Sequence, residues 1–283
     1  MTVRRLSAGL VAAALFVPGL AACNADGTTP AGSSATPSTS ASGSAPATGN
    51  AGNAGDAKQA LLDSTREISN GNFRFTMSGG GSTAEGQVHE PSQSAQMKVS
   101  LGRPTDDLSM TLDLIHIKPD SWVKLDLGGR AADSVPGRQN LNLGKYQHLD
   151  QTRIQGNRNL AFDFDQVDPA GSAVLTQGIT EARRTGDGTY AGTLDVSKAA
   201  DAGSLDPAVI TALGPQARSV PFTAKLDPQG RLSELVVQIP AAGQSAAQEI
   251  RITYADYGNA TPAQKPSAEQ VVEAPAEFYN LFD

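Results

Sequence analysis

Apolar residues recur at every second position along most of the chain after Asn72. Phe73, Phe75 and Met77 alternate with polar side chains, and a two-residue period of this kind places all apolar groups on one face of a strand. One apolar and one polar face are typical of antiparallel sheets that are covered on one side only. The further segments that we predict as strands on this ground are 97–101, 108–114, 123–127, 222–226, 235–239 and 250–254. We also predict a weak strand over 85–90, after a glycine-rich turn, and strands over 179–184 and 189–196, which flank the hairpin turn Gly186-Asp187-Gly188.

Helical periodicity is limited to short segments. We predict one amphipathic helix over 56–69, in which Asp56 and Gln59 resemble a capping box at its start. Two further short helices are predicted over 169–177 and 207–213, since each follows an Asp-Pro pair and proline is favoured in a first helical turn.

The predicted fold class is therefore mainly β with a few helices. About ten strands that share an apolar face must curve around a core, because exposed faces and edges of a wide sheet are costly. We expect a curved antiparallel sheet that forms an incomplete barrel, covered by short helices. Two alternatives stay open for its interior. With few bulky side chains and little helical cover it encloses an apolar hollow, or it is filled, as protein interiors normally are.

The first residues have a different pattern, which predicts export. Two arginines precede an apolar stretch over 10–17, and the small residues of Leu20-Ala21-Ala22-Cys23 follow. This is typical of a secretory signal, and the apolar stretch is well short of the roughly 20 residues of a membrane-spanning helix. The last four residues resemble the lipobox of bacterial lipoproteins. That resemblance implies a diacylglycerol thioether on Cys23 and anchoring by acyl chains. The alternative is an ordinary signal peptide cut elsewhere.

Composition divides the chain into four parts. Residues 1–22 are the expected signal peptide. The segment 23–55 joins the expected lipidated Cys23 to a Ser/Thr/Pro/Gly/Ala linker, which we predict to be disordered because it lacks large apolar side chains. The strands and helices lie in 56–260, and 261–283 is a C-terminal tail. The candidate docking residues of this tail are Val271, Val272, Phe278, Tyr279 and Phe282.

Charge and cysteine content exclude several classes of function. The net charge is −7 and basic residues do not cluster, so we expect binding neither to nucleic acid nor to anionic headgroups through charge. Cys23 is the single cysteine, so no internal disulfide can stabilise the fold.

No pattern of catalytic residues emerges. The three histidines, His89, His116 and His148, have no metal-binding spacing, and no Gly-x-Ser-x-Gly elbow occurs. Asp163 and Asp165 could form a carboxylate pair, but a solvated pair on a strand or loop is the commoner arrangement. We therefore predict a protein that is not an enzyme and needs neither metal nor cofactor.

Several motifs in 56–260 together resemble one family. They include Trp122-Val123-Lys124-Leu125, Asp168-Pro169, Asp187-Gly188-Thr189-Tyr190 and the turn from Lys225 to Leu232. With the lipobox and the linker, they resemble the LppX/LprAFG family of actinobacterial lipoproteins, which share the half-barrel fold of the periplasmic carrier LolA.

This resemblance implies a lipid-anchored protein on the outer face of the cell membrane. Its apolar interior would bind acyl chains of lipids or lipoglycans and carry or present them in the cell envelope, with an unidentified export or transporter partner. The alternative is a non-catalytic surface or assembly lipoprotein of the same fold, with a filled core, that acts through its outer face. By strand alternation, the lining of the cavity is predicted to be Phe73, Phe75, Met97, Val99, Met110, Leu112, Leu114, Val123 and Leu125.

Overall fold

A computed structural model describes residues 54–103, 105–157, 159–197, 205, 207–243 and 245–282. All of them belong to one compact unit, Thr48–Asp283. The expected signal peptide, Cys23 and almost all of the expected linker lie outside the described residues.

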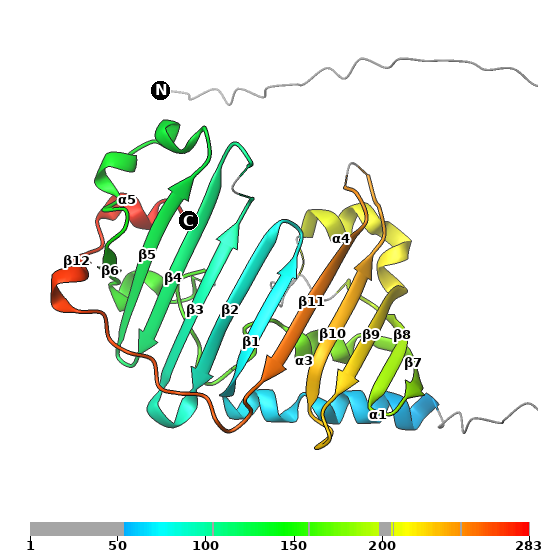
Figure 1. The fold of residues 1–283 in the computed structure, drawn as a ribbon. Helices are drawn as coiled ribbons and strands as arrows, with labels where there is room; N and C mark the ends of the chain where they lie inside the picture. Colours follow the sequence, from blue (N-terminus) through cyan, green and yellow to red (C-terminus); the bar gives the residue numbers. More distant parts are fainter. Residues whose placement is uncertain are drawn as a thin grey trace, which may run out of the picture. The chain divides into compact units, whose positions relative to one another are not determined.

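The described chain forms one twelve-stranded sheet (Figure 1). Its strands are β1 (Asn72–Gly79), β2 (Ser82–His89), β3 (Ser94–Leu101), β4 (Ser109–Ile117), β5 (Asp120–Gly128), β6 (Tyr146–His148), β7 (Ile179–Gly186), β8 (Thr189–Leu194), β9 (Val220–Leu226), β10 (Leu232–Ile239), β11 (Gln248–Ala255) and β12 (Val271–Glu273). The helices are α1 (Ala54–Ser64), α2 (Gln151–Ile154), α3 (Ser172–Gln177), α4 (Pro207–Leu213) and α5 (Ala276–Tyr279).

The order of the strands is β12-β6-β5-β4-β3-β2-β1-β11-β10-β9-β8-β7. Neighbouring strands are antiparallel except for β12 and β6, which are parallel. The sheet is curved and does not close, so the predicted fold class, an incomplete antiparallel barrel with a few helices, is confirmed.

Some predicted boundaries differ from the structure. Helix α1 begins at Ala54, so Asp56 lies within its first turn and does not precede the helix as a capping box requires. The helix expected from residue 169 begins at Ser172. Asp168 nevertheless caps it, since its carboxylate accepts from the backbone N–H groups of Ser172 (3.1 Å) and Ala173 (2.8 Å). Strands β6 and β12 were not predicted, because three residues are too few to show a period.

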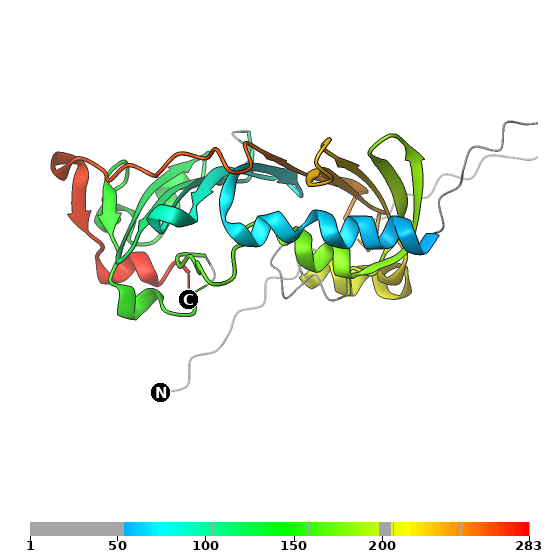
Figure 2. The same ribbon diagram turned by 90° about the horizontal axis from the view of Figure 1, so that it is seen from below.

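The helices cover one face of the sheet, which we call the inner face (Figure 2). Two packed clusters lie on it. The first joins α1, α3 and α4 to β1–β3 and to β7–β11, and it includes Leu61 and Phe73. The second joins α2 and α5 to β4 and β5, and it includes Leu112 and Phe278. The cover of the sheet therefore comes in two parts, which meet at Met97 and Val99 of β3.

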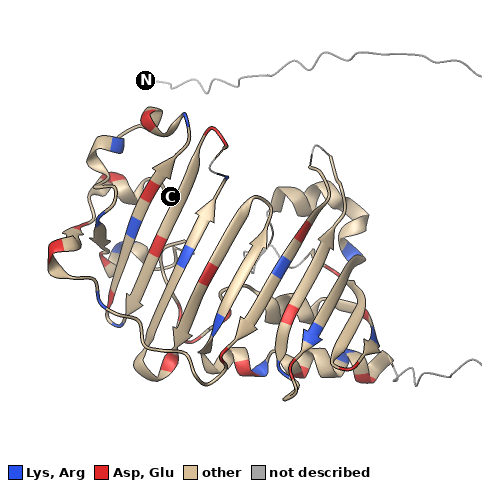
Figure 3. Ribbon diagram, in the orientation of Figure 1, with Lys and Arg blue, Asp and Glu red and all other residues tan. Residues whose placement is uncertain are grey.

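The opposite, outer face carries alternating charges (Figure 3). Across the strands Lys124 is directly opposite Asp113, Asp113 opposite Lys98, and Lys98 opposite Glu85. The Lys124 ammonium lies 3.6 Å from the Asp113 carboxylate. Opposite charges at facing positions favour this register, and they keep the outer face in contact with water.

The segment after β11 crosses this outer face before it reaches β12 (Figure 2). Its backbone N–H at Ala263 donates to the Ser94 hydroxyl at 3.0 Å, and Ala263 packs against Ile115 and Trp122. The Lys265 ammonium lies 5.1 Å from the centre of the Trp122 ring. The tail expected over 261–283 is thus packed on the sheet.

Gly86 marks a close approach between strands in the middle of the sheet. A Cβ atom at this position would lie 2.6 Å from the Gln96 carbonyl oxygen and 2.9 Å from Cε1 of Phe75. These distances are shorter than van der Waals contact, so β1, β2 and β3 can approach in this way only because residue 86 has no side chain.

We expect Gly86→Ala to lower the free energy of unfolding by about 1–3 kcal/mol, the usual cost of overpacking. The measurement is urea unfolding followed by circular dichroism. The control is Gly55→Ala in α1, where an added Cβ meets nothing within 4 Å; it should be neutral or stabilise by up to about 1 kcal/mol. A Gly86→Ala protein within about 0.5 kcal/mol of wild type would contradict this account.

Candidate functional site

All nine residues predicted to line a cavity lie on the inner face, but their exposure differs. The strand register places them on one side of β1, β3, β4 and β5. Six are buried against other parts of the protein: Phe73, Phe75, Leu112, Leu114, Val123 and Leu125. The other three, Met97, Val99 and Met110, are half-buried. The covered residues belong to the two clusters, and the half-buried ones lie at the margins of these clusters.

The half-buried residues form a continuous apolar strip. Met97 and Val99 pack against both clusters, so they lie where the two meet. Leu101, which pairs with Met110 across β3 and β4, has 44% of its surface exposed. We call the set Met77, Met97, Val99, Leu101 and Met110 the central strip. It is the part of the inner face that the helices cover least.

Small residues lie beside the central strip. On β2, Ala84 is directly opposite Val99, and Gly86 is directly opposite Met97. Larger side chains would not fit at Gly86, because Phe75 and Met97 already occupy the space above it. Ala84 is itself buried. Sequence reasoning missed these two residues, because small residues add little to a hydrophobic period.

The inner face is also almost free of titratable groups. Among the inner positions of β1–β6, His116 is the only one. Its Nδ1 lies 2.9 Å from the Ser121 hydroxyl, and its ring lies 5.6 Å from that of Phe162. Burial lowers the pKa of His116 to about 4, so the ring is neutral at neutral pH. A neutral, apolar surface suits hydrocarbon and disfavours charged ligands.

A further polar group of the inner face is Gln147 on β6. It is directly opposite Val123 and Val272, and its side chain is fully buried. Neither its amide nitrogen nor its amide oxygen has a hydrogen-bond partner among the described residues. No signal in the sequence pointed to this residue, because β6 is too short to be recognised.

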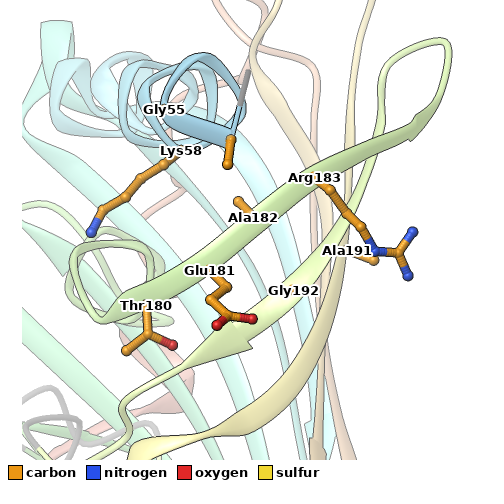
Figure 4. A pocket seen from close by; sticks show the side chains of 9 residues that line it. Gly55, Lys58, Thr180, Glu181, Ala182, Arg183, Ala191 and Gly192 are labelled. Atoms are coloured by element: carbon orange, nitrogen blue, oxygen red, sulfur yellow. The ribbon is translucent and has the colours of Figure 1, made fainter. Parts of the chain in front are cut away.

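Three hollows among the described residues bring together no groups suited to one ligand. One of about 500 Å³ lies where α1 meets β7 and β8 (Figure 4). Its wall consists largely of alanine and glycine, and the side chains of Lys58 and Arg183 point away from one another. A second, of about 650 Å³, lies between α1 and the turn at Gly230. A third, of about 410 Å³, is lined mainly by polar side chains of β1–β4.

The residues considered for catalysis do not form a site in the described chain. The Asp163 carboxylate accepts from the Asp165 backbone N–H at 2.8 Å, which is a local turn. The His89 ring contacts the Ser92 hydroxyl at 2.7 Å. No group of three or more histidine, cysteine or acidic side chains suited to a metal occurs among the described residues.

Comparisons with known proteins identify no relative: no family model, no curated protein and no solved structure matches this chain. The resemblance to the LppX/LprAFG family therefore stays a prediction. In the part of the chain that the structure describes, no helix has the length and apolar character to cross a membrane.

Because His116 is buried and neutral, we expect it to make stability fall in acid. Its folded pKa of about 4 lies below the ordinary 6.5. The stabilisation is therefore present above pH 6.5 and is lost as the pH falls towards 4. Between about pH 7.5 and pH 5, the wild type should lose about 2 kcal/mol more than His116→Gln, which cannot take up a proton there. Urea unfolding at the two pH values measures this difference. Equal losses in both proteins would show that His116 is accessible to protons in the folded state.

Proposed function

We propose that this protein is a membrane-anchored lipoprotein that binds acyl chains of a lipid or lipoglycan on the inner face of its sheet. The observation that supports this proposal is the central strip. It is a continuous apolar surface, without charge, that the protein's own helices leave half-covered.

The energetic argument is simple. An acyl chain gains about 0.8 kcal/mol for each methylene group that it transfers from water to an apolar surface. The methionine side chains of the strip, at Met77, Met97 and Met110, are flexible and adapt to chains of different shape. The central strip has no ionic group that could select a headgroup. The site therefore recognises the hydrocarbon part of the ligand.

Anchoring follows from the N-terminal pattern. In the proposal, Cys23 carries diacylglycerol and the linker after it joins the sheet to the membrane. A binding surface held near the bilayer meets its ligand at high local concentration. The protein would then carry or present the lipid in the envelope.

A second candidate function is supported by the burial of six of the nine predicted lining residues. In this alternative the inner face is a filled core, and the protein is a non-catalytic surface or assembly lipoprotein. It would act through the charged outer face. The two candidates differ in whether lipid occupies the central strip, which can be measured directly.

The first prediction of the proposal concerns Val99 and Ser100, adjacent residues of β3 that are both half-buried but face opposite sides. Val99→Lys places an ammonium group on the strip, whereas Ser100→Lys places one on the outer face. We expect Val99→Lys to weaken binding of a fluorescent C16 fatty acid by at least about tenfold. Ser100→Lys should stay within about twofold of wild type.

Native mass spectrometry of wild type after gentle extraction should also show co-purified lipid. Thermal unfolding of both variants verifies that they are folded. If neither wild type nor Ser100→Lys binds the fatty acid, and no lipid co-purifies, the filled-core alternative is correct.

The second prediction concerns the anchor. Cys23→Ala should abolish incorporation of an alkyne-labelled fatty acid and move the protein from the membrane fraction to the soluble fraction. The thioether needs the Cys23 sulfur, and acyl chains supply the membrane affinity. Thr28→Ala, in the expected linker, should keep both label and membrane location. Labelling of the Cys23→Ala chain would mean that the acyl group is attached elsewhere.

A further inference from the structure

We propose that residues 276–282, which we call the C-terminal plug, occupy the part of the inner face that a bound acyl chain takes, and that the ligand displaces them. The inference rests on the proposed function and adds a regulatory step to it. The plug consists of α5 and the three residues that follow.

The path of the chain brings the plug to the inner face from outside. After crossing the outer face, the chain adds β12 to the edge strand β6 and then passes to the other side (Figures 1 and 2). There Phe278 and Tyr279 are buried in the second cluster, while Leu281 and Phe282 are partly buried against it. The plug therefore contributes its apolar side chains from a segment that follows β12 and does not connect two strands of the described sheet.

The plug packs in the same cluster as four residues that were predicted to contact lipid. Leu112, Leu114, Val123 and Leu125 belong to the cluster that contains Phe278. Val99, in the central strip, packs at the margin of this cluster. Without the plug, these side chains would lose part of their cover, although Leu149 and Leu160 of the same cluster would remain. An acyl chain can replace the plug with little loss of apolar contact, since it exchanges one hydrocarbon surface for another.

Besides the apolar packing of Phe278 and Tyr279, few polar contacts hold the plug. The Asp150 backbone N–H donates to the Tyr279 hydroxyl at 2.8 Å, and the Arg153 guanidinium lies 3.9 Å from the centre of that ring. The Asn157 amide donates to the Phe282 carbonyl at 3.3 Å. Helix α5 has four residues, too few to be stable alone. A short segment with so few hydrogen bonds to the sheet opens at lower free energy than the central strands.

Gln147 is an independent observation that favours a second, open state. It lies on the inner face of β6, the strand to which β12 adds, and its buried amide has no partner among the described residues. A buried amide without hydrogen bonds destabilises the closed state. Movement of β12 and the plug away from β6 would expose this amide to water or to an ester carbonyl of the ligand.

The test locks the plug with a disulfide. His148 and Glu273 are directly opposite each other on β6 and β12, a separation that a disulfide spans, and Glu273 lies three residues before α5. We make His148→Cys/Glu273→Cys in the mature chain with Cys23→Ser, so that the new pair holds the only thiols. The oxidised protein should bind the fluorescent C16 fatty acid at least about tenfold more weakly than the same protein after reduction.

The opposite change should release the plug. In Phe278→Ser/Tyr279→Ser the closed state is weakened, so affinity should rise several-fold as the competent fraction increases. Glu277→Ser, at an exposed position of the same helix, should bind like wild type. Gln147→Leu removes the unpaired amide, which favours the closed state and should weaken binding.

The outcomes separate this inference from the proposed function. Equal binding by oxidised and reduced protein, with binding still lost in Val99→Lys, would overturn the plug and leave the lipid site standing. Absence of binding in wild type, reduced and plug-released proteins would overturn both. If the serine variant fails to fold, as thermal unfolding will show, the oxidised and reduced comparison decides alone.

Discussion

The apolar face of an open sheet is stable in water only when other elements pack on it. The need to bury this face constrains the whole structure. A closed barrel would bury its own interior, but here the sheet ends at β7 and β12 without joining. The cover comes from α1 before the first strand, from helices between strands, and from α5 after the last. These pieces gather into two clusters. The region between the clusters is left half-covered, and the proposed binding site lies there.

One face of the sheet is charged and the other is not, because side chains alternate between the two faces along each strand. Alternation along each strand sends Lys98, Asp113 and Lys124 to the outer face and Val99, Leu112 and Val123 to the inner one. The outer charges face each other in opposite-sign pairs, which favours one strand register. The inner face is consequently neutral, and a neutral apolar surface can recognise a ligand through its hydrocarbon alone.

The C-terminal segment connects the two faces. It packs on Trp122 outside, lengthens the sheet at β6, and then buries Phe278 inside. One short segment therefore protects an edge that would otherwise be open to pairing and also covers part of the apolar face. Both roles belong to one continuous segment, with β12 at the edge and α5 three residues further on over the apolar face.

Local pattern was enough to predict most of this fold. Most of the long strands, such as β1, β4, β5, β9 and β11, have a clear period of two. Asp187-Gly188 forms the expected hairpin turn between β7 and β8. The nine candidate lining residues share one face for the same reason. Strands β6 and β12 were missed, because each exists only through hydrogen bonds to a neighbour that is distant in sequence. The roles of Gly86 and Gln147 depend likewise on what surrounds them.

The amino-acid sequence alone determined which side chains face inward, since the direction of a side chain in a strand depends only on its position along that strand. It also determined that the inner face is apolar and that the outer face is charged. Only the tertiary structure decided which inward residues are covered. Phe73 is buried and Val99 half-buried because elements such as α1 and α5, from opposite ends of the described chain, pack on different parts of one sheet. No local pattern records contacts over such separations.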